Sequence, residues 1–161
     1  MQNASANIRF EKGYGEKLNY LSNHFDLMLF ALSLHHQNAS LSLSEAYRVL
    51  KPNGMVIILE PTENGEVQRL FHIYNDETDA LRAAQAAIES SHFKRLKRSI
   101  FRSTWSFVNR QELIEFDFGQ GSKPSIDKQK RIEELIGSKI GQFPILLADE
   151  LVLSLLKKEA T

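Results

Sequence analysis

The sequence predicts an α/β fold built around a mostly parallel β-sheet, and two observations favour this class. The stretch Phe25–Pro61 reads as a strand, a helix, a tight turn and a second strand. Such a unit places its two strands side by side and parallel, with the helix covering the sheet. Strands and helices then continue to alternate toward the end of the chain, which is typical of a sheet layered with helices.

The first half of the chain contains three expected strands and one helix. Asn7–Lys12 alternates apolar and polar residues, and Gly13-Tyr14-Gly15 ends it. Phe25–Phe30 and Met55–Leu59 are short apolar runs that suit buried strands. Ser42–Leu50 lies between them and has apolar residues at helical spacing. The sequence Lys-Pro-Asn-Gly that follows stops the helix and forms a turn with positive φ.

The second half alternates helices with two further strands. Glu66–Tyr74 and Thr78–Ser90 carry apolar residues at helical spacing and form one helix or two. Phe93–Phe107 is rich in aromatic and β-branched residues, which is typical of a strand. Two more helices begin at residues suited to N-caps. These helices and the last strand cover Asn109–Phe118, Ser125–Ile136 and Leu151–Leu156.

Composition indicates an ordinary globular protein without a strong electrostatic field. The chain has 20 basic and 20 acidic residues and a formal net charge of zero, so no global field favours nucleic acid. The basic cluster Lys94–Arg98 is interpreted as the solvated face of a strand, with contact to a substrate phosphate or RNA as the alternative. The absence of cysteine excludes disulfides and fits a cytoplasmic protein. The apolar runs are far shorter than the roughly 20 residues that a membrane-spanning helix needs.

The sequence of Phe25–Pro61 also resembles a known enzyme family. A Phe-Asp pair opens the first apolar strand, which leads into Leu34-His35-His36. The helix ends in EAYRVLKPNG, and the second strand ends in Glu60-Pro61. This combination resembles the middle of class I S-adenosylmethionine (AdoMet)-dependent methyltransferases. The resemblance implies a Rossmann-like sheet of seven strands in the order 3-2-1-4-5-7-6, in which the seventh strand is antiparallel.

The resemblance assigns the expected strands to the family's strands three to seven. These are, in order, Asn7–Lys12, Phe25–Phe30, Met55–Leu59, Arg95–Trp105 and Leu151–Leu156. Strands one and two, with the glycine-rich loop that approaches the cofactor, have no counterpart. The chain is therefore expected to be the C-terminal two-thirds of one methyltransferase domain, a truncated form lacking the first two strands. Residues 1–61 would hold the cofactor-side strands, and residues 62–161 the substrate-side helices with strands six and seven.

The resemblance implies AdoMet as cofactor, and a first segment expected to contact it lies before the Phe25–Phe30 strand. Tyr14, Gly15 and Glu16 follow Gly13, where the family often has Gly-Asp-Ala-Glu. The aspartate of that motif accepts a hydrogen bond from the adenine, and here Tyr14 takes its place. A turn that needs the conformational freedom of glycine is the alternative interpretation.

A second segment expected to contact the cofactor is formed by Ala31, Leu32 and Ser33, directly after the Phe25–Phe30 strand. Open α/β sheets bind ligands beyond the carboxyl ends of their strands. Family members place the methionine and ribose portions of AdoMet along this segment. An ordinary connection between a strand and a helix is the alternative.

The candidate catalytic residues are His35 and His36. Either imidazole could orient a substrate or act as a general base, since histidine titrates near neutral pH. The alternative is a buried, hydrogen-bonded imidazole beside an exposed one. Adjacent histidines are poor joint metal ligands, so no metal site is predicted. Glu60 is expected to shape the substrate mouth or to cap the next segment, and Asp76 and Glu77 to serve a helix start.

The resemblance implies methyl transfer from AdoMet to an unidentified small molecule. The alternative is a non-catalytic, methyltransferase-like interaction subunit or one half of a split enzyme. Because strand edges need pairing or cover, the free edge of Phe25–Phe30 has three expected partners. These are the strand Asn7–Lys12, a second copy in a homodimer, or a complementing N-terminal chain.

Overall fold

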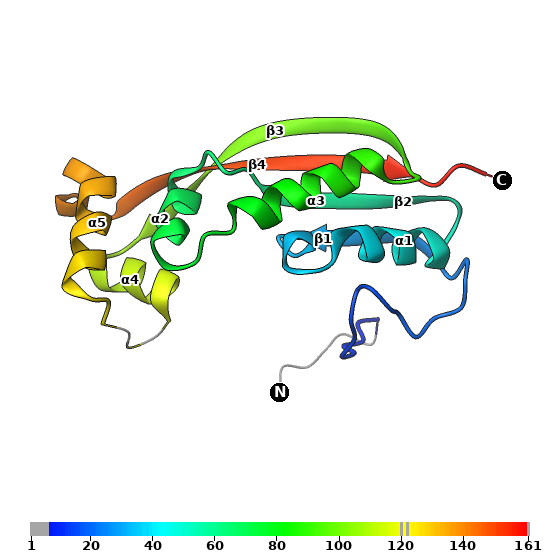
Figure 1. The fold of residues 1–161 in the computed structure, drawn as a ribbon, viewed down its shortest axis with the longest axis horizontal. Coiled ribbons are helices and arrows are strands. Elements are labelled where there is room, and N and C mark those ends of the chain that lie inside the picture. Colours follow the sequence, from blue (N-terminus) through cyan, green and yellow to red (C-terminus); the bar gives the residue numbers. More distant parts are fainter. Residues whose placement is uncertain (1–6, 120, 122, 161) are drawn as a thin grey trace.

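The computed structural model describes residues 7–119, 121 and 123–160, and within them four strands form one mixed sheet. The strands are β1 (Phe25–Ala31), β2 (Leu50–Pro61), β3 (Lys94–Phe107) and β4 (Ile145–Lys157), and their order is β1-β2-β4-β3 (Figure 1). β1 and β2 pair in parallel, whereas β4 runs antiparallel to β2 and to β3. This is the expected order of strands four, five, seven and six, and the α/β class is confirmed.

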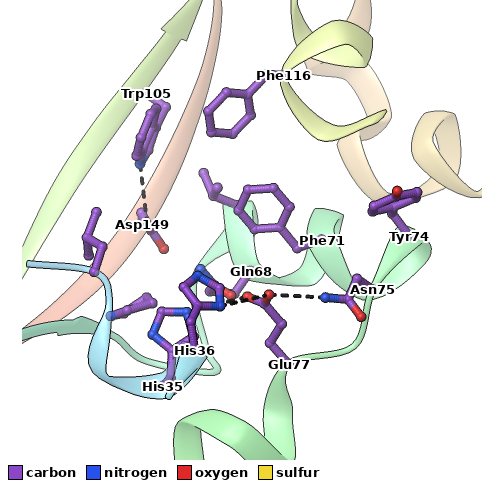
Figure 2. Close-up of a pocket in the computed structure, with 13 residues that line it drawn as sticks. His35, His36, Gln68, Phe71, Tyr74, Asn75, Glu77, Trp105, Phe116 and Asp149 are labelled. Atoms are coloured by element: carbon purple, nitrogen blue, oxygen red, sulfur yellow. Dashed lines mark hydrogen bonds and ion pairs between the residues drawn. The ribbon is translucent and has the colours of Figure 1, made fainter. Parts of the chain in front are cut away.

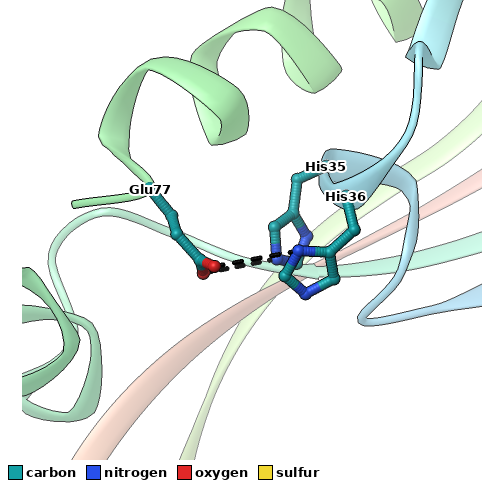
Figure 3. Close-up of side chains that lie close together, drawn as sticks. All are labelled: His35, His36 and Glu77. Carbon is teal, nitrogen blue, oxygen red and sulfur yellow. Dashed lines mark ion pairs between the residues drawn. The ribbon is translucent and has the colours of Figure 1, made fainter. Parts of the chain in front are cut away.

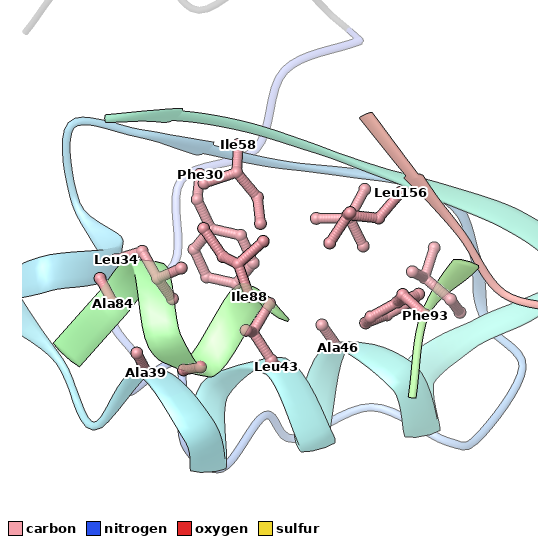
Figure 4. Close-up of a cluster of buried hydrophobic side chains, with 13 residues drawn as sticks. Phe30, Leu34, Ala39, Leu43, Ala46, Ile58, Ala84, Ile88, Phe93 and Leu156 are labelled. Carbon is pink, nitrogen blue, oxygen red and sulfur yellow. The ribbon is translucent and has the colours of Figure 1, made fainter. Parts of the chain in front are cut away.

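The helices form two groups, each with its own hydrophobic cluster. α1 (Ala39–Val49) and α3 (Thr78–Ser90) pack with β1 and β2. α2 (Glu66–Tyr74), α4 (Arg110–Phe118) and α5 (Ile126–Ile136) gather at the other end of the molecule, where the long strands β3 and β4 extend (Figure 1). Figure 4 shows the first cluster, whose buried members include Phe30, Leu34, Leu43, Ala46, Ile58 and Ile88.

β2 begins earlier than predicted because the turn after α1 is built into its start. Leu50 already pairs with β1, and the next recorded pair on β2 is formed by Met55. Asn53 has a φ of 65°, as the Asn-Gly turn predicts. A Cβ on Gly54 would lie 2.9 Å from the carbonyl oxygen of Lys51, so the tight turn requires glycine there.

The prediction of a strand at Asn7–Lys12 is wrong. This segment forms no strand, and its apolar residues Ile8 and Phe10 are 55% and 84% exposed. Alternating residues form a stable strand only where a neighbouring strand completes their backbone hydrogen bonds, and the segment meets no strand edge. Pairing of this segment with β1 is therefore also wrong. Within the described residues, the outer edge of β1 has no strand beside it.

The segment that precedes β1 is held by an ion pair on α1. Glu45 accepts a hydrogen bond from the backbone N–H of Leu18 at 2.7 Å. Arg48 donates to the carbonyl oxygens of Leu18 and Tyr20 at 3.1 and 2.9 Å. The hydrogen bond from Arg48 to Glu45 also lowers the pKa of the Glu45 carboxyl. The N-terminal segment thus lies against a helix instead of extending the sheet.

The remaining helices agree with the sequence at their ends. The segment predicted as one helix or two forms the separate helices α2 and α3. Asn109 and Ser125 cap α4 and α5, accepting from the backbone N–H groups of Glu112 and Lys128. A 3₁₀ turn, η1 (Leu34–His36), precedes α1, and a second one, η2 (Gly137–Gly141), follows α5. None of the described helices is long and apolar enough to cross a membrane.

Candidate functional site

A cavity of about 340 Å³ opens beyond the carboxyl ends of the parallel strands β1 and β2 (Figure 2). This is where open α/β sheets bind ligands. Four aromatic side chains form much of its wall, namely Phe71, Tyr74, Trp105 and Phe116. Its other lining residues are Leu32, His35, His36, Pro61, Val67, Gln68, Asn75, Glu77 and Asp149. The cavity therefore combines an apolar wall with a polar cluster, as small-molecule sites do.

A buried carboxylate at the end of β2 organises the edge of this cavity. Glu60 has no solvent-exposed surface. Its Oε1 accepts hydrogen bonds from the backbone N–H groups of Ser33 and Leu34 at 3.1 and 2.8 Å. Its Oε2 meets the Nδ1 atom of the His35 ring. One side chain thus fixes three consecutive residues that follow β1, which is more than the mouth-shaping or capping role expected for Glu60.

The connection after β1 turns sharply at Leu32. This residue has a φ of 50°, a conformation that few residues other than glycine adopt. Its N–H donates to the carbonyl oxygen of Leu59 at 2.8 Å, and its side chain lines the cavity. A strained backbone that persists needs surrounding contacts to hold it. The Glu60 bonds to the next two residues supply such contacts.

Both predicted catalytic histidines lie at the cavity, and a third residue joins them (Figure 3). The His35 side chain is 4% exposed and the His36 side chain 57% exposed. Glu77 places its Oε2 3.6 Å from His35 Nε2 and its Oε1 3.7 Å from His36 Nδ1. The Asn75 side-chain amide donates to Glu77 Oε1 at 3.1 Å.

Glu77 is a candidate site residue that the sequence pattern does not reveal. It is the N-cap of α3, but its side chain makes no capping hydrogen bond. Asp76 takes the local role instead, because its Oδ1 accepts from the Thr78 N–H at 3.0 Å. Glu77 is therefore free to turn toward the histidines. Glu77 is far from His35 in the sequence, so no sequence pattern indicates that they are close. The packing of α3 against η1 brings the two residues together.

The far wall of the cavity holds two buried polar side chains. Asp149 on β4 is 3% exposed and accepts from Trp105 Nε1 at 3.3 Å. Burial raises the pKa of the Asp149 carboxyl above its ordinary value. Gln68 on α2 is 4% exposed, and its Oε1 has no hydrogen-bond partner in the part of the chain that the structure describes. A buried oxygen without a donor is costly, and a bound ligand could satisfy it.

The residues predicted to contact AdoMet fall in two neighbouring places. Gln37 links them, because its amide nitrogen donates to the Ser33 carbonyl at 2.9 Å. A Cβ on Gly15 would lie 1.9 Å from the Gln37 side-chain oxygen. Glu16 accepts from the Asn38 N–H at 2.9 Å, and this hydrogen bond lowers its carboxyl pKa. Tyr14 is 74% exposed and does not line the cavity.

The residues expected to contact AdoMet lie on one side of the cavity or beside it, and their role in binding stays a prediction. Ala31, Leu32 and Ser33 lie at the carboxyl end of β1, and Leu32 reaches the cavity. Gly15 and Glu16 are engaged with the start of α1, on the other side of Gln37. No glycine-rich loop flanks β1 among the described residues. These positions are compatible with one wall of the cofactor site that the resemblance implies.

Comparison with known proteins agrees with this arrangement. The model of a methyltransferase domain family matches residues 1–58. The Escherichia coli K12 protein YafE, which is uncharacterized, is 34% identical over 110 residues, covering 67% of this chain and 47% of YafE. The chain therefore spans about half the length of this curated relative.

Solved structures support the same fold. A proposed methyltransferase from Bacillus halodurans C-125 (BH2331) superposes with a TM-score of 0.64 at 17% identity, covering 92% of this chain and 71% of that protein. YcgJ from Bacillus subtilis gives a TM-score of 0.63 at 16% identity, covering 96% and 73%. The strand order and these superpositions show the fold of class I methyltransferases, and the family match over residues 1–58 agrees with it. The predicted resemblance to that class is confirmed.

Removing the buried carboxylate tests its role in holding the site together. Glu60→Ala is expected to lower the free energy of unfolding by about 3 kcal/mol, because the N–H groups of Ser33 and Leu34 and the His35 ring lose a buried acceptor. Urea denaturation followed by circular dichroism measures this loss. Glu63→Ala, which removes a more exposed carboxylate, is the control and is expected to change stability by no more than about 0.5 kcal/mol. A loss below about 1 kcal/mol for Glu60→Ala would contradict the role.

Proposed function

We propose that this chain provides the acceptor side of an AdoMet-dependent methyltransferase that acts on a small molecule. The observation that carries the proposal is the position of the cavity. It lies beyond the carboxyl ends of two parallel strands whose order relative to β4 and β3 matches strands four, five, seven and six of the class. The class places its cofactor beside the first of these strand ends, so a molecule in the cavity would lie next to it.

The cavity also indicates what kind of acceptor it holds. Phe71, Trp105 and Phe116 offer flat apolar surfaces, and Asp149 and Gln68 place polar atoms beside them. About 340 Å³ suits a small organic molecule better than a polymer segment. We propose an acceptor with an aromatic or apolar body and a polar group that reaches the unpaired oxygen of Gln68.

The chain's own residues would contribute alignment and proton transfer. AdoMet supplies a methyl group on a sulfonium, which is displaced directly by the acceptor. Ala31, Leu32 and Ser33 would form the wall that holds the cofactor's methionine end next to the cavity. His35 and His36 are the groups placed to accept a proton if the acceptor must lose one. The Glu60 hydrogen bonds keep this segment in place and so maintain the alignment.

The free edge of β1 is the proposed place where a second polypeptide completes the site. Leu27 and Leu29 on β1 are 49% and 63% exposed, and no described strand lies outside them. Unpaired strand edges with apolar side chains favour pairing with another chain. We propose that a second copy in a homodimer or a complementing N-terminal chain covers this edge and supplies the other cofactor wall. The cytoplasmic location expected from the sequence stays a prediction.

Calorimetric titration with AdoMet and with its demethylated product tests the proposed cofactor site. We expect micromolar binding by the assembled protein, and at least tenfold weaker binding by Leu32→Asp, because the new carboxylate would face the methionine carboxylate of the cofactor. Aspartate tolerates positive φ, so the turn should persist in this variant. Leu96→Asp, at an exposed position on β3, is the control with unchanged binding. Absence of heat from folded protein at every protein concentration would favour the non-catalytic interaction subunit.

The proposed cover of β1 predicts self-association or complementation. Light scattering after size-exclusion chromatography should give a mass above that of one chain, and hydrogen exchange should be slow also at those Phe25–Ala31 amides that point away from β2. Leu29→Lys should shift the protein toward the single chain and remove this protection, because a lysine on the exposed face of an edge strand disfavours pairing with another chain. A monomer in which these amides exchange freely, and whose AdoMet binding is intact, would contradict the proposed cover.

A further inference from the structure

The sequence predicts no metal site, because adjacent histidines alone are poor joint ligands, but the fold adds a third donor beside them. We propose that His35, His36 and Glu77 form a binding site for one divalent first-row transition metal ion, such as Zn²⁺, open toward the cavity (Figure 3). The three residues come from η1 and from the start of α3, which are separate in sequence and packed together in the fold. The inference does not depend on methyl transfer, because it concerns side chains whose ligand can be tested with the metal alone.

The spacing of the donor atoms fits a shared cation. His35 Nε2 lies 3.6 Å from Glu77 Oε2, and His36 Nδ1 lies 3.7 Å from Glu77 Oε1. One donor atom from each of the three residues lies within 4.8 Å of the other two. The two N···O separations are longer than a normal hydrogen bond. Ligands bound tetrahedrally to one Zn²⁺ ion at about 2.0–2.2 Å stand about 3.3–3.6 Å apart. Small side-chain movements would therefore bring the three atoms around one ion.

The orientation of His35 is the strongest argument for the site. Glu60 is a buried carboxylate with only acceptor atoms, so the His35 Nδ1 that meets it carries the proton and donates. The lone pair of the neutral ring is then on Nε2, the atom that faces Glu77. A histidine that binds a metal through one ring nitrogen usually donates the N–H of its other ring nitrogen to a carboxylate or a backbone carbonyl.

The surroundings of Glu77 support a cation for electrostatic reasons. In the neutral form of His35, the lone pair on Nε2 and the Glu77 carboxylate repel each other unless a cation lies between them. Glu77 and Asp149 both line the cavity, and none of the described lining residues is a lysine or an arginine. Asn75 donates to Glu77 Oε1, which steadies the carboxylate without neutralising its charge. A metal ion would supply the missing positive charge.

The ligand types restrict the kind of ion. Two imidazoles and one carboxylate suit Zn²⁺, Co²⁺ and related transition metals, whereas Mg²⁺ and Ca²⁺ prefer sites made of oxygen atoms. Three protein ligands leave at least one coordination position open, as in catalytic zinc sites. Because His36 is exposed and all three residues line the cavity, that position would be accessible to a small molecule bound there. A bound metal would occupy both imidazole lone pairs, so the ion would replace the histidines as the group that activates an acceptor.

Metal titration of the untagged protein, stripped with a chelator and measured without AdoMet, tests this site. Calorimetry with ZnCl₂ should give one ion per chain with micromolar or tighter affinity, and Co²⁺ should give visible absorption bands from the bound ion. His36→Ala and Glu77→Gln each remove one ligand and should weaken Zn²⁺ binding at least tenfold. Circular dichroism checks that each variant is folded, and Glu77 is partly exposed, so its amide variant should fold.

Two further variants distinguish a specific metal site from non-specific binding of Zn²⁺ to any histidine. His72→Ala is the matched control, because His72 also stands 3.6 Å from a carboxylate, that of Asp76, but belongs to no three-residue group. Its Zn²⁺ affinity should be unchanged. Glu60→Gln keeps an oxygen for Ser33 and Leu34 but presents an N–H to His35, which would move the ring proton to Nε2. This variant should lose Zn²⁺ affinity at least tenfold although it removes no ligand.

The outcomes distinguish this inference from the proposed function. Failure of the folded wild-type chain to bind Zn²⁺ or Co²⁺, or equal binding by wild type, His36→Ala and Glu77→Gln, would overturn the metal site. Repeating the AdoMet titration in the presence of the chelator tests the cofactor separately. AdoMet binding without metal binding would leave the histidines as bases, and metal binding without AdoMet binding would establish the metal site alone.

Discussion

The interaction on which the site depends is the burial of the Glu60 carboxylate at the end of β2. A buried charge is costly unless hydrogen bonds compensate it. Here the compensation comes from the N–H groups of Ser33 and Leu34 and from the His35 ring. These donors belong to the segment after β1, so the same bonds that satisfy the carboxylate fix the neighbouring strand's exit. The sharp turn at Leu32 and the direction of His35 follow from this constraint.

The sheet explains why this constraint lies beside a cavity. β1 and β2 are parallel neighbours, so their carboxyl ends meet at one edge, and the chain must leave both strands there. β4 lies next to β2, runs antiparallel to it and brings Asp149 to the same end of the sheet, where Trp105 of β3 donates a hydrogen bond to it. α2 and the link to α3 then close the space with Phe71, Gln68 and Glu77. The strand order thus determines which side chains can share the cavity.

Local sequence patterns predicted the helices and strands correctly where interactions with a few nearby residues or with one adjacent strand determine the structure. The apolar runs Phe25–Phe30 and Met55–Leu59 form paired strands, and Asn109 and Ser125 cap their helices, because these signals act over a few residues. The strand predicted at Asn7–Lys12 does not form, because its alternating residues need a neighbouring strand and the described residues supply none. The resemblance of Leu34-His35-His36 to the family's sequence singled out the two histidines; both line the cavity, and their catalytic role stays a prediction.

Glu77 could not be identified in that way, since its neighbours in sequence suggest a helix start and its position beside the histidines arises from packing between α3 and η1. The same holds for Gln68 and Asp149, which ordinary sequence rules place on a helix and a strand without indicating a shared cavity. The binding role of Tyr14, Gly15, Glu16 and the Ala31–Ser33 segment stays a prediction. Their placement around Gln37 shows only that the two segments are close.

The most direct test of the account is the tautomer of His35, read from long-range proton–nitrogen correlation spectra of the ¹⁵N-labelled, metal-free protein at about pH 8, where an ordinary imidazole is neutral. The account predicts that Nδ1 carries the proton and that Nε2 carries the lone pair, because Glu60 offers only acceptors to Nδ1. Comparison with a His35→Gln sample assigns the signals. A ring protonated on Nε2 alone would contradict the central claim that the buried carboxylate orients this histidine toward the cavity.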